Sequence, residues 1–353
     1  PRYDRLNRYR NGLLRSAEWN YGPQQWFMSN LQVTKLSSKS NLYNKIKATI
    51  AYQNFKESRI DRDYQSSVRH SREEAVDAYS FNLDLEKRVS TKTQFFYGAE
   101  YVYNKVRSTG KEVDLSNNTQ VSSVSRYPNG SSWQSAAVYS SIKYKPNRKF
   151  VFQSGLRFNY VTSEADFTEN NAYLNLPFES AKNESEALTG TAGISWSPNS
   201  TIQWKLNASS AFRAPNIDDV GKIREKSGNV TVPNIHLKPE YAYNFETGIL
   251  KYFNNRKFHT GLNIYYTLLN NYITRDYFEV NNSPTIMYDG EEGTVVANVN
   301  KGNAYIVGST FSFNGNINNT WHSKGSLTYT KGKTYDTKLP LSSIPPLFGN
   351  LEI

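Results

Sequence analysis

The chain has 353 residues, a formal net charge of +11, 37% hydrophobic residues, 26 tyrosines and no cysteine. The lack of cysteine excludes disulfides, thiolate metal sites and cysteine nucleophiles, and no run approaches the roughly 18 apolar residues of a membrane-spanning helix. Aromatic residues, at 14%, are too frequent for a disordered chain, and abundant tyrosine is typical of surfaces that are apolar on one side and wet on the other.

Apolar and polar residues alternate in long segments along the chain. The clearest segments begin at Phe150, Ile202, Phe258 and Tyr305. A period of two places successive side chains on opposite faces of a β-strand. These segments extend over roughly ten residues or more, which is longer than most strands of soluble sheets. The sequence therefore predicts long strands with one apolar and one polar face.

Short polar connectors alternate with long polar segments. The short connectors lie at 37–41, 87–91, 145–149, 197–201, 253–257 and 318–322. The long segments, predicted as loops, lie at 56–75, 105–131, 162–185, 214–240, 272–302 and 333–345. Short turns at one end and long loops at the other are typical of an outer-membrane β-barrel, whereas soluble sandwiches and propellers use shorter strands. We predict an all-β fold, a transmembrane antiparallel β-barrel.

The two ends of the sequence look cut. Pro1 follows no initiator Met or signal peptide, and Ile353 lies inside an apolar run. We count about 13 strands from Trp26 onward, whereas bacterial single-chain barrels have even strand numbers. Residues 1–353 are therefore expected to be a fragment of a barrel.

The apolar strand faces are expected to contact lipid. Phe152, Leu206, Ile264 and Phe311 represent these faces, and Asn207 represents the opposite, lumen-facing side. The basic residues are spread over strands and loops without a compact basic run, so no nucleic-acid partner is expected. The charge is either ordinary lumen and rim charge or a positive lumen or mouth that attracts anionic ligands or lipopolysaccharide phosphates.

Two conspicuous segments flank the predicted loop 214–240. The first, at 210–219, ends a strand, and the second, at 237–240, precedes the next strand. Pro215 and Pro239 mark where the hydrogen-bond ladder stops and resumes, because proline has no N–H to donate. Asn216 and Asp218 are turn-forming residues. On these properties alone, the segments are two strand ends facing a surface loop.

These two segments resemble the paired FRAP and LKPE signature of TonB-dependent outer-membrane receptors. The matching residues are Phe212, Arg213, Ala214, Pro215, Asn216, Asp218, Leu237, Lys238, Pro239 and Glu240. Further similarity lies at 300–308, at 340–347, and at 17–24, which resembles the Bacteroidetes branch. The resemblance thus spans most of the chain. His236 stands where the family more often has an acidic residue, so no fixed chemical role is assigned to this loop.

The resemblance implies a 22-stranded barrel with an N-terminal plug domain that binds TonB. Residues 1–353 would be a partial barrel domain, with the plug and terminal strands missing. The resemblance implies TonB-dependent uptake of a scarce ligand. An iron–siderophore or haem is the first expectation, and cobalamin or a glycan are the alternatives. The expected partners are outer-membrane lipid, lipopolysaccharide, that small ligand and the TonB–ExbB–ExbD complex, reached through the plug. A passive porin-like barrel is the alternative function.

Ligand specificity is expected in the long loops, because loops tolerate variation while a rigid scaffold holds them. In loop 214–240 the signature residues at both ends are expected to be structural, and the middle to face the ligand. The candidate ligand-binding residues are Arg224, Glu225, Lys226, Asn229, His236, Tyr272 and Tyr277.

No enzyme activity, cofactor or metal site is expected. His70, His236, His259 and His322 are the only histidines, and no two have a metal-ligand spacing. The acidic segment 289–293 lacks the full spacing of a calcium loop and is interpreted as solvated. No serine lies in a G-x-S-x-G context.

Overall fold

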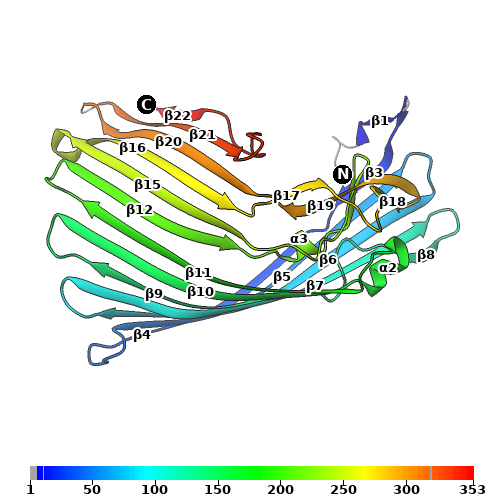
Figure 1. The fold of residues 1–353 in the computed structure, drawn as a ribbon, viewed down its shortest axis with the longest axis horizontal. Coiled ribbons are helices and arrows are strands. Elements are labelled where there is room, and N and C mark those ends of the chain that lie inside the picture. Colours follow the sequence, from blue (N-terminus) through cyan, green and yellow to red (C-terminus); the bar gives the residue numbers. More distant parts are fainter. Residues whose placement is uncertain (1–5, 11, 319) are drawn as a thin grey trace.

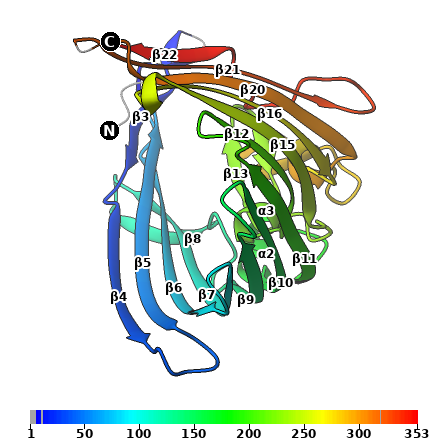
Figure 2. The ribbon, with the colours of Figure 1, turned by 90° about the vertical axis from the view of Figure 1, so that its left-hand side faces the viewer.

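A curled antiparallel sheet forms most of the molecule, as a computed structural model of residues 6–10, 12–318 and 320–353 shows (Figures 1 and 2). The sheet has 15 strands. They are β3 (Ser16–Tyr21), β4 (Gln25–Leu36), β5 (Lys45–Asp63), β6 (Val68–Arg88), β7 (Thr93–Asp114), β8 (Thr119–Ser123), β9 (Ser132–Tyr144), β10 (Phe150–Asp166), β11 (Ser180–Trp196), β12 (Ile202–Arg213), β15 (Glu240–Phe253), β16 (Phe258–Asn270), β20 (Asn303–Asn316), β21 (His322–Thr334) and β22 (Phe348–Glu352).

Smaller elements gather mainly where the long connections lie (Figure 1). A second sheet of five strands contains β13 (Arg224–Lys226), β14 (Asn229–Thr231), β17 (Ile273–Tyr277), β18 (Thr285–Tyr288) and β19 (Glu291–Asn300). The other elements are β1 (Tyr9–Arg10), β2 (Leu13–Leu14), α2 (Thr168–Leu174), α3 (Ile217–Val220) and η1 (Asn254–Arg256). Among the described residues, no helix is both long and apolar enough to cross a membrane.

The predicted hairpin order is confirmed. Strand β4 begins at Gln25, next to the predicted start at Trp26, and from β4 to β22 the large sheet has 13 strands besides the short β8. The connectors 145–149 and 197–201 separate strands as predicted. Residue 319, in the predicted connector 318–322, lies outside the described residues. Within the described part, β22 at one edge does not pair with β3 or β4 at the other.

The prediction of a loop at 56–75 is wrong. Strand β5 continues to Asp63 and β6 begins at Val68, so only a short turn separates them. The ladder continues because charged side chains pair on and between the strands: Arg59 contacts Glu57 at 2.7 Å and Arg62 contacts Glu18 at 2.8 Å. The predicted loops at 105–131 and 162–185 are likewise shortened, because β7, β10 and β11 extend into them.

The two faces of the large sheet differ in chemistry. The strand register places one row of side chains on the same face of the sheet: Phe152, Ile194, Leu206, Thr247 and Ile264. Several side chains on this face are exposed; that of Leu206, for example, is 45% exposed.

On the other face Lys47 contacts Asp84 at 3.4 Å, and the Tyr139 hydroxyl donates to Asp84 at 2.6 Å. On β6, Arg72 shares this face with Asp84, since residues an even number apart point the same way. Arg72 contacts Asp289 of the β18–β19 turn, so the loops fold over the polar face.

The main hydrophobic core lies among the loops. Phe167, Ile223, Val230, Val295 and Ala297 are fully buried in one cluster. Strand β14, from loop 214–240, pairs in parallel with β19, from loop 272–302, so two loops far apart in the sequence share one small sheet.

Candidate functional site

A polar cavity of about 250 Å³ lies at the loop end of the sheet. Strands β3, β5 and β6 form one side, and the hairpins β13–β14 and β18–β19 form the other. We call this cavity the loop-end basin. Its charged and histidine lining residues are Arg8, Arg15, Arg59, Asp61, Asp63, His70, Arg72, Arg126, Arg224, Glu225, Lys226, Asp289, Glu291 and Glu292.

Strand alternation explains why β5 and β6 contribute so many charges to the basin. Arg59 and Asp61 lie two residues apart on β5, and directly opposite them on β6 lie Arg72 and His70. Residues that face each other across an antiparallel pair project from the same side of the sheet. All four side chains therefore point into the basin.

Two arginines of the basin are compensated by two glutamates. Arg126, whose side chain is only 5% exposed, contacts Glu57 at 3.4 Å and Glu74 at 3.2 Å. Arg59 contacts the same Glu57 at 2.7 Å. Burial raises the pKa of Glu74 above its usual value, although Arg126 and Arg59 oppose this shift.

A third arginine has no such partner. Arg224 lies on β13 and forms no ion pair within the described part of the chain, while Arg126 and Arg59 lie near enough to act on it. Burial, followed by the repulsion of these two guanidiniums, lowers the pKa of Arg224. In the corner of the basin formed by Arg59, Arg126 and Arg224, three guanidiniums thus share the two carboxylates of Glu57 and Glu74, while the six carboxylates in the basin lining lie elsewhere along it. This local excess of arginine suits an anionic group, because guanidinium binds carboxylate or phosphate through paired hydrogen bonds.

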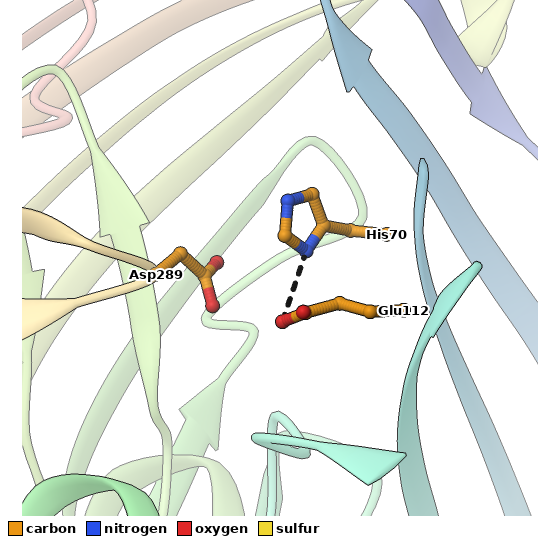
Figure 3. Close-up of side chains that lie close together, drawn as sticks. All are labelled: His70, Glu112 and Asp289. Atoms are coloured by element: carbon orange, nitrogen blue, oxygen red, sulfur yellow. Dashed lines mark ion pairs between the residues drawn. The ribbon is translucent and has the colours of Figure 1, made fainter. Parts of the chain in front are cut away.

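A second cluster lies at the rim of the basin (Figure 3). His70 Nδ1 lies 3.6 Å from Glu112 Oε1, and one ligand atom each of His70, Glu112 and Asp289 lies within 4.8 Å of the other two. Arg72 joins this cluster to the basin, since it contacts Asp61 at 3.4 Å and also bonds Asp289. Of the described residues, these three form the group that could hold a metal ion.

The first signature segment folds into a compact corner at the end of β12. Asn216 caps α3 through a capping box with Asp219, and Arg213 pairs with Asp219 and, at 3.7 Å, with Glu240. Pro215 is fully buried beside this corner, and Asp218 accepts hydrogen bonds from the Tyr127 hydroxyl and Lys222 at 2.6 Å. Phe212 lies next to Tyr241, with ring centroids 6.3 Å apart, and Ala214 connects it to the corner.

The second signature segment ties the two long loops together. Leu237 is buried against Ile217 and Val220 of α3. The Lys238 N–H donates to the Asn300 side chain at 2.7 Å, and the Asn300 amide donates back to the Lys238 carbonyl at 2.8 Å. After Pro239, Glu240 accepts a hydrogen bond from the Ile273 N–H at 2.6 Å.

The structure separates the candidate ligand-binding residues into two groups. Arg224, Glu225 and Lys226 line the basin, and Asn229 pairs with Lys226 across the β13–β14 hairpin. The other candidates do not line it. His236 is exposed before Leu237, Tyr272 is half-buried, and Tyr277 is 77% exposed.

Sequence reasoning missed Arg59, Arg72 and Arg126. The first two lie in the polar segment 56–75, which the sequence predicts to be a loop. The available signal was their period of two: Glu57, Arg59, Asp61 and Asp63 occupy every second position. Arg126 carries no such pattern, since it lies in the irregular segment after β8.

A long-stranded, curled sheet with an exposed apolar face, a polar inner face and a charged basin under its long loops defines a receptor-type β-barrel of the outer membrane. The family model for the TonB dependent receptor-like β-barrel matches residues 1–353. The chain therefore belongs to the TonB-dependent receptor family and is an outer-membrane β-barrel protein.

Solved structures of similar fold agree with this assignment. The copper transporter OprC matches with a TM-score of 0.74 and 15% identity, over 95% of this chain and 50% of that one. The Serratia marcescens hemophore receptor HasR, in complex with its hemophore HasA and heme, has a TM-score of 0.65 and 13% identity over 93% of this chain and 54% of its own.

The ferric yersiniabactin uptake receptor FyuA from Yersinia pestis has a TM-score of 0.65 and 11% identity, over 95% of this chain and 47% of its own. The chain thus spans about half the length of these structures. No curated protein matches it.

Proposed function

We propose that the full-length protein captures a scarce, negatively charged ligand in the loop-end basin and imports it by a TonB-dependent mechanism. An iron–siderophore or haem fits best, with cobalamin or a glycan as alternatives. Residues 1–353 would form part of the barrel domain. The TonB–ExbB–ExbD complex would supply the energy through a plug domain elsewhere in the protein.

The observation that carries this proposal is the surplus guanidinium of Arg224. Ferric chelates of carboxylate or catecholate siderophores are anionic, and haem presents two propionates. A carboxylate placed between Arg224, Arg126 and Arg59 would neutralise their repulsion, and charge-assisted hydrogen bonds of this kind are among the stronger polar contacts. The cavity is smaller than the roughly 300–1,000 Å³ of typical ligand pockets, so the basin would hold an acidic group of the ligand rather than all of it.

The cargo of two structural neighbours falls within this range: HasR is a hemophore receptor in complex with heme, and FyuA is a ferric yersiniabactin uptake receptor. The copper of the transporter OprC lies outside it. The signature residues would act structurally, since Arg213, Asp219, Lys238 and Glu240 bond within and between the two long loops.

The test is growth and ligand uptake in a deletion strain that carries the full-length gene. We expect wild-type protein to restore growth on haem or on a ferric siderophore as sole iron source. Arg224→Gln should weaken ligand binding roughly ten- to a hundredfold, because a hydrogen bond to a charged group is worth about 1.5–3 kcal/mol.

Lys338→Gln is the matched control, since Lys338 is an exposed basic residue of the long loop 333–345 that does not line the basin. Equal binding by wild type and Arg224→Gln would contradict the basin as the capture site. Uptake that persists without TonB would instead favour the passive porin-like barrel.

A further inference from the structure

We propose that His70, Glu112 and Asp289 form a binding site for a divalent transition-metal ion, such as Zn²⁺, that fastens the β18–β19 hairpin to the barrel wall. Figure 3 shows the three side chains directed toward one another from the wall and from the hairpin. His70 and Asp289 also line the loop-end basin, but the metal site rests on its own three residues and does not require the ligand proposed for the corner around Arg224.

The wall supplies two of the three ligands by register. His70 on β6 lies directly opposite Glu112 on β7, so both side chains project from the same face. His70 Nδ1 is buried and has no hydrogen-bond partner; its contact with Glu112 Oε1, at 3.6 Å, is too long for a hydrogen bond. A buried nitrogen lone pair or N–H without a partner is costly, and a metal ion would satisfy it.

The hairpin supplies the third ligand through its turn. Asp289 and Gly290 connect β18 to β19 and both have positive φ, +49° and +79°. Asp-Gly with two positive φ values forms the tight type I′ turn that matches the twist of a two-stranded hairpin. Asp289 therefore lies at the hairpin tip, and its side chain is only 21% exposed although its backbone is at the surface.

Ligand chemistry selects the class of ion. Ca²⁺ and Mg²⁺ prefer oxygen ligands only, whereas imidazole with carboxylates suits Zn²⁺ and its neighbours among the transition metals. In a tetrahedral zinc site, ligand atoms lie roughly 3.4 Å apart for bonds of about 2.1 Å. The 3.6 Å pair on the wall is already close to that spacing. The widest separation, up to 4.8 Å, would close by rotation of the Glu112 and Asp289 side chains.

The neighbouring charges also favour a cation. Arg72 bonds Asp289 and contacts Asp61 at 3.4 Å, so one guanidinium is shared by two carboxylates. Glu112 adds a third negative charge. A bound carboxylate has two oxygens, and a hydrogen bond to one of them orients the other toward a metal. The side chains of His70 and Glu112 are 21% and 32% exposed, which leaves the ion a path from water.

The consequence is a metal-dependent fastening of loop 272–302. The expectation that the chain has no metal site rested on spacing along the sequence, and His70 and Asp289 are brought together only by the fold.

The binding test is calorimetric titration of the full-length receptor in detergent with ZnCl₂. We expect one Zn²⁺ per receptor, and affinity reduced roughly tenfold or more by His70→Ala or by Glu112→Gln. Heat-modifiable gel mobility would reveal a variant that fails to fold. In that case the other variant still tests the site. His236→Ala is the matched control, because His236 is an exposed loop histidine outside the cluster, and it should bind Zn²⁺ as wild type does.

The fastening itself is tested with two spin labels. Residues 1–353 contain no cysteine. Met287→Cys on the hairpin and Leu115→Cys beyond β7, at positions 56% and 43% exposed, give defined labelling sites once any cysteine elsewhere in the full-length receptor has been replaced. We expect Zn²⁺ to narrow the distance distribution between them, and His70→Ala to abolish this effect. Zn²⁺ binding that is unchanged in both ligand variants would overturn the site, and an unchanged distance distribution would overturn the fastening.

Discussion

The barrel wall and the loop assembly bury their apolar side chains in different surroundings. On the wall, Val138 and Leu188 are 57% and 65% exposed, whereas Phe167, Ile223 and Val295 in the loops are fully buried. Lipid surrounds the wall, so an apolar side chain there needs no protein neighbours. The loops meet water and must close a core of their own, as a small soluble domain does.

The backbone shows the same contrast. The wall is a continuous ladder of antiparallel hairpins, as a sheet in lipid requires, because each unpaired N–H would cost several kcal/mol there. The loops are joined by short pairings and side-chain bonds between distant segments, such as the 2.8 Å bond from the Asn234 amide to the Asn298 carbonyl. We therefore expect the loop assembly to unfold while the barrel wall remains folded. The following predictions test whether the two regions unfold independently.

The largest expected effect is loss of the loop core. Phe167→Ala removes a fully buried ring that contacts Phe178 edge-on, with centroids 5.1 Å apart. It should destabilise the loop assembly by about 3–5 kcal/mol. Hydrogen exchange in segments 214–240 and 272–302 should accelerate while heat-modifiable gel mobility still reports a folded barrel.

The matched control is Leu188→Ala, which truncates a 65% exposed side chain of the wall and should leave loop exchange unchanged. Loss of the folded barrel in Phe167→Ala would show that the two regions unfold together.

The second prediction concerns the wall. Leu206→Arg places a charge on the face that meets lipid and should cost about 2–4 kcal/mol near the bilayer midplane. Asn207→Arg, one residue along β12 and on the polar face, should be tolerated. Folding yields in lipid vesicles measure both, and equal damage by the two substitutions would show that the faces are assigned wrongly.

The same contrast explains what could be predicted from sequence. The wall was predictable because each strand carries its own period-two pattern and each hairpin its own short turn, both readable locally. The extension of β5 and β6 beyond the apolar pattern was missed, since charged residues such as Arg59 and Glu57 continue the ladder only when their partners are near.

The site was less predictable, because it depends on contacts between distant segments. The sequence predicts that the middle of loop 214–240 faces the ligand, and the structure places Arg224 and Lys226 of that segment in the lining of the basin. Arg126 lies between Glu57 and Glu74, and Asp289 lies beside His70. No residue spacing along the sequence indicates either of these two sets of contacts.

The smallest expected effect is a pH dependence within the loop assembly. Burial would raise the pKa of Asp218, but hydrogen bonds from Lys222 and Tyr127 outweigh it and lower that pKa below its usual value. A carboxyl whose pKa is lower in the folded loop stabilises that loop above the unfolded value of about 3.9, and this contribution is lost as pH falls through the folded pKa. The Asp218 side chain is 54% exposed, so solvent screening limits its contribution to less than about 1 kcal/mol. Asp218→Asn should therefore loosen the corner slightly at pH 7 and remove this acid-dependent step. The mobility of a spin label at Lys226→Cys would report both the loosening at pH 7 and the change on acidification. If Asp218→Asn leaves the acid transition unchanged, that transition belongs to another carboxyl.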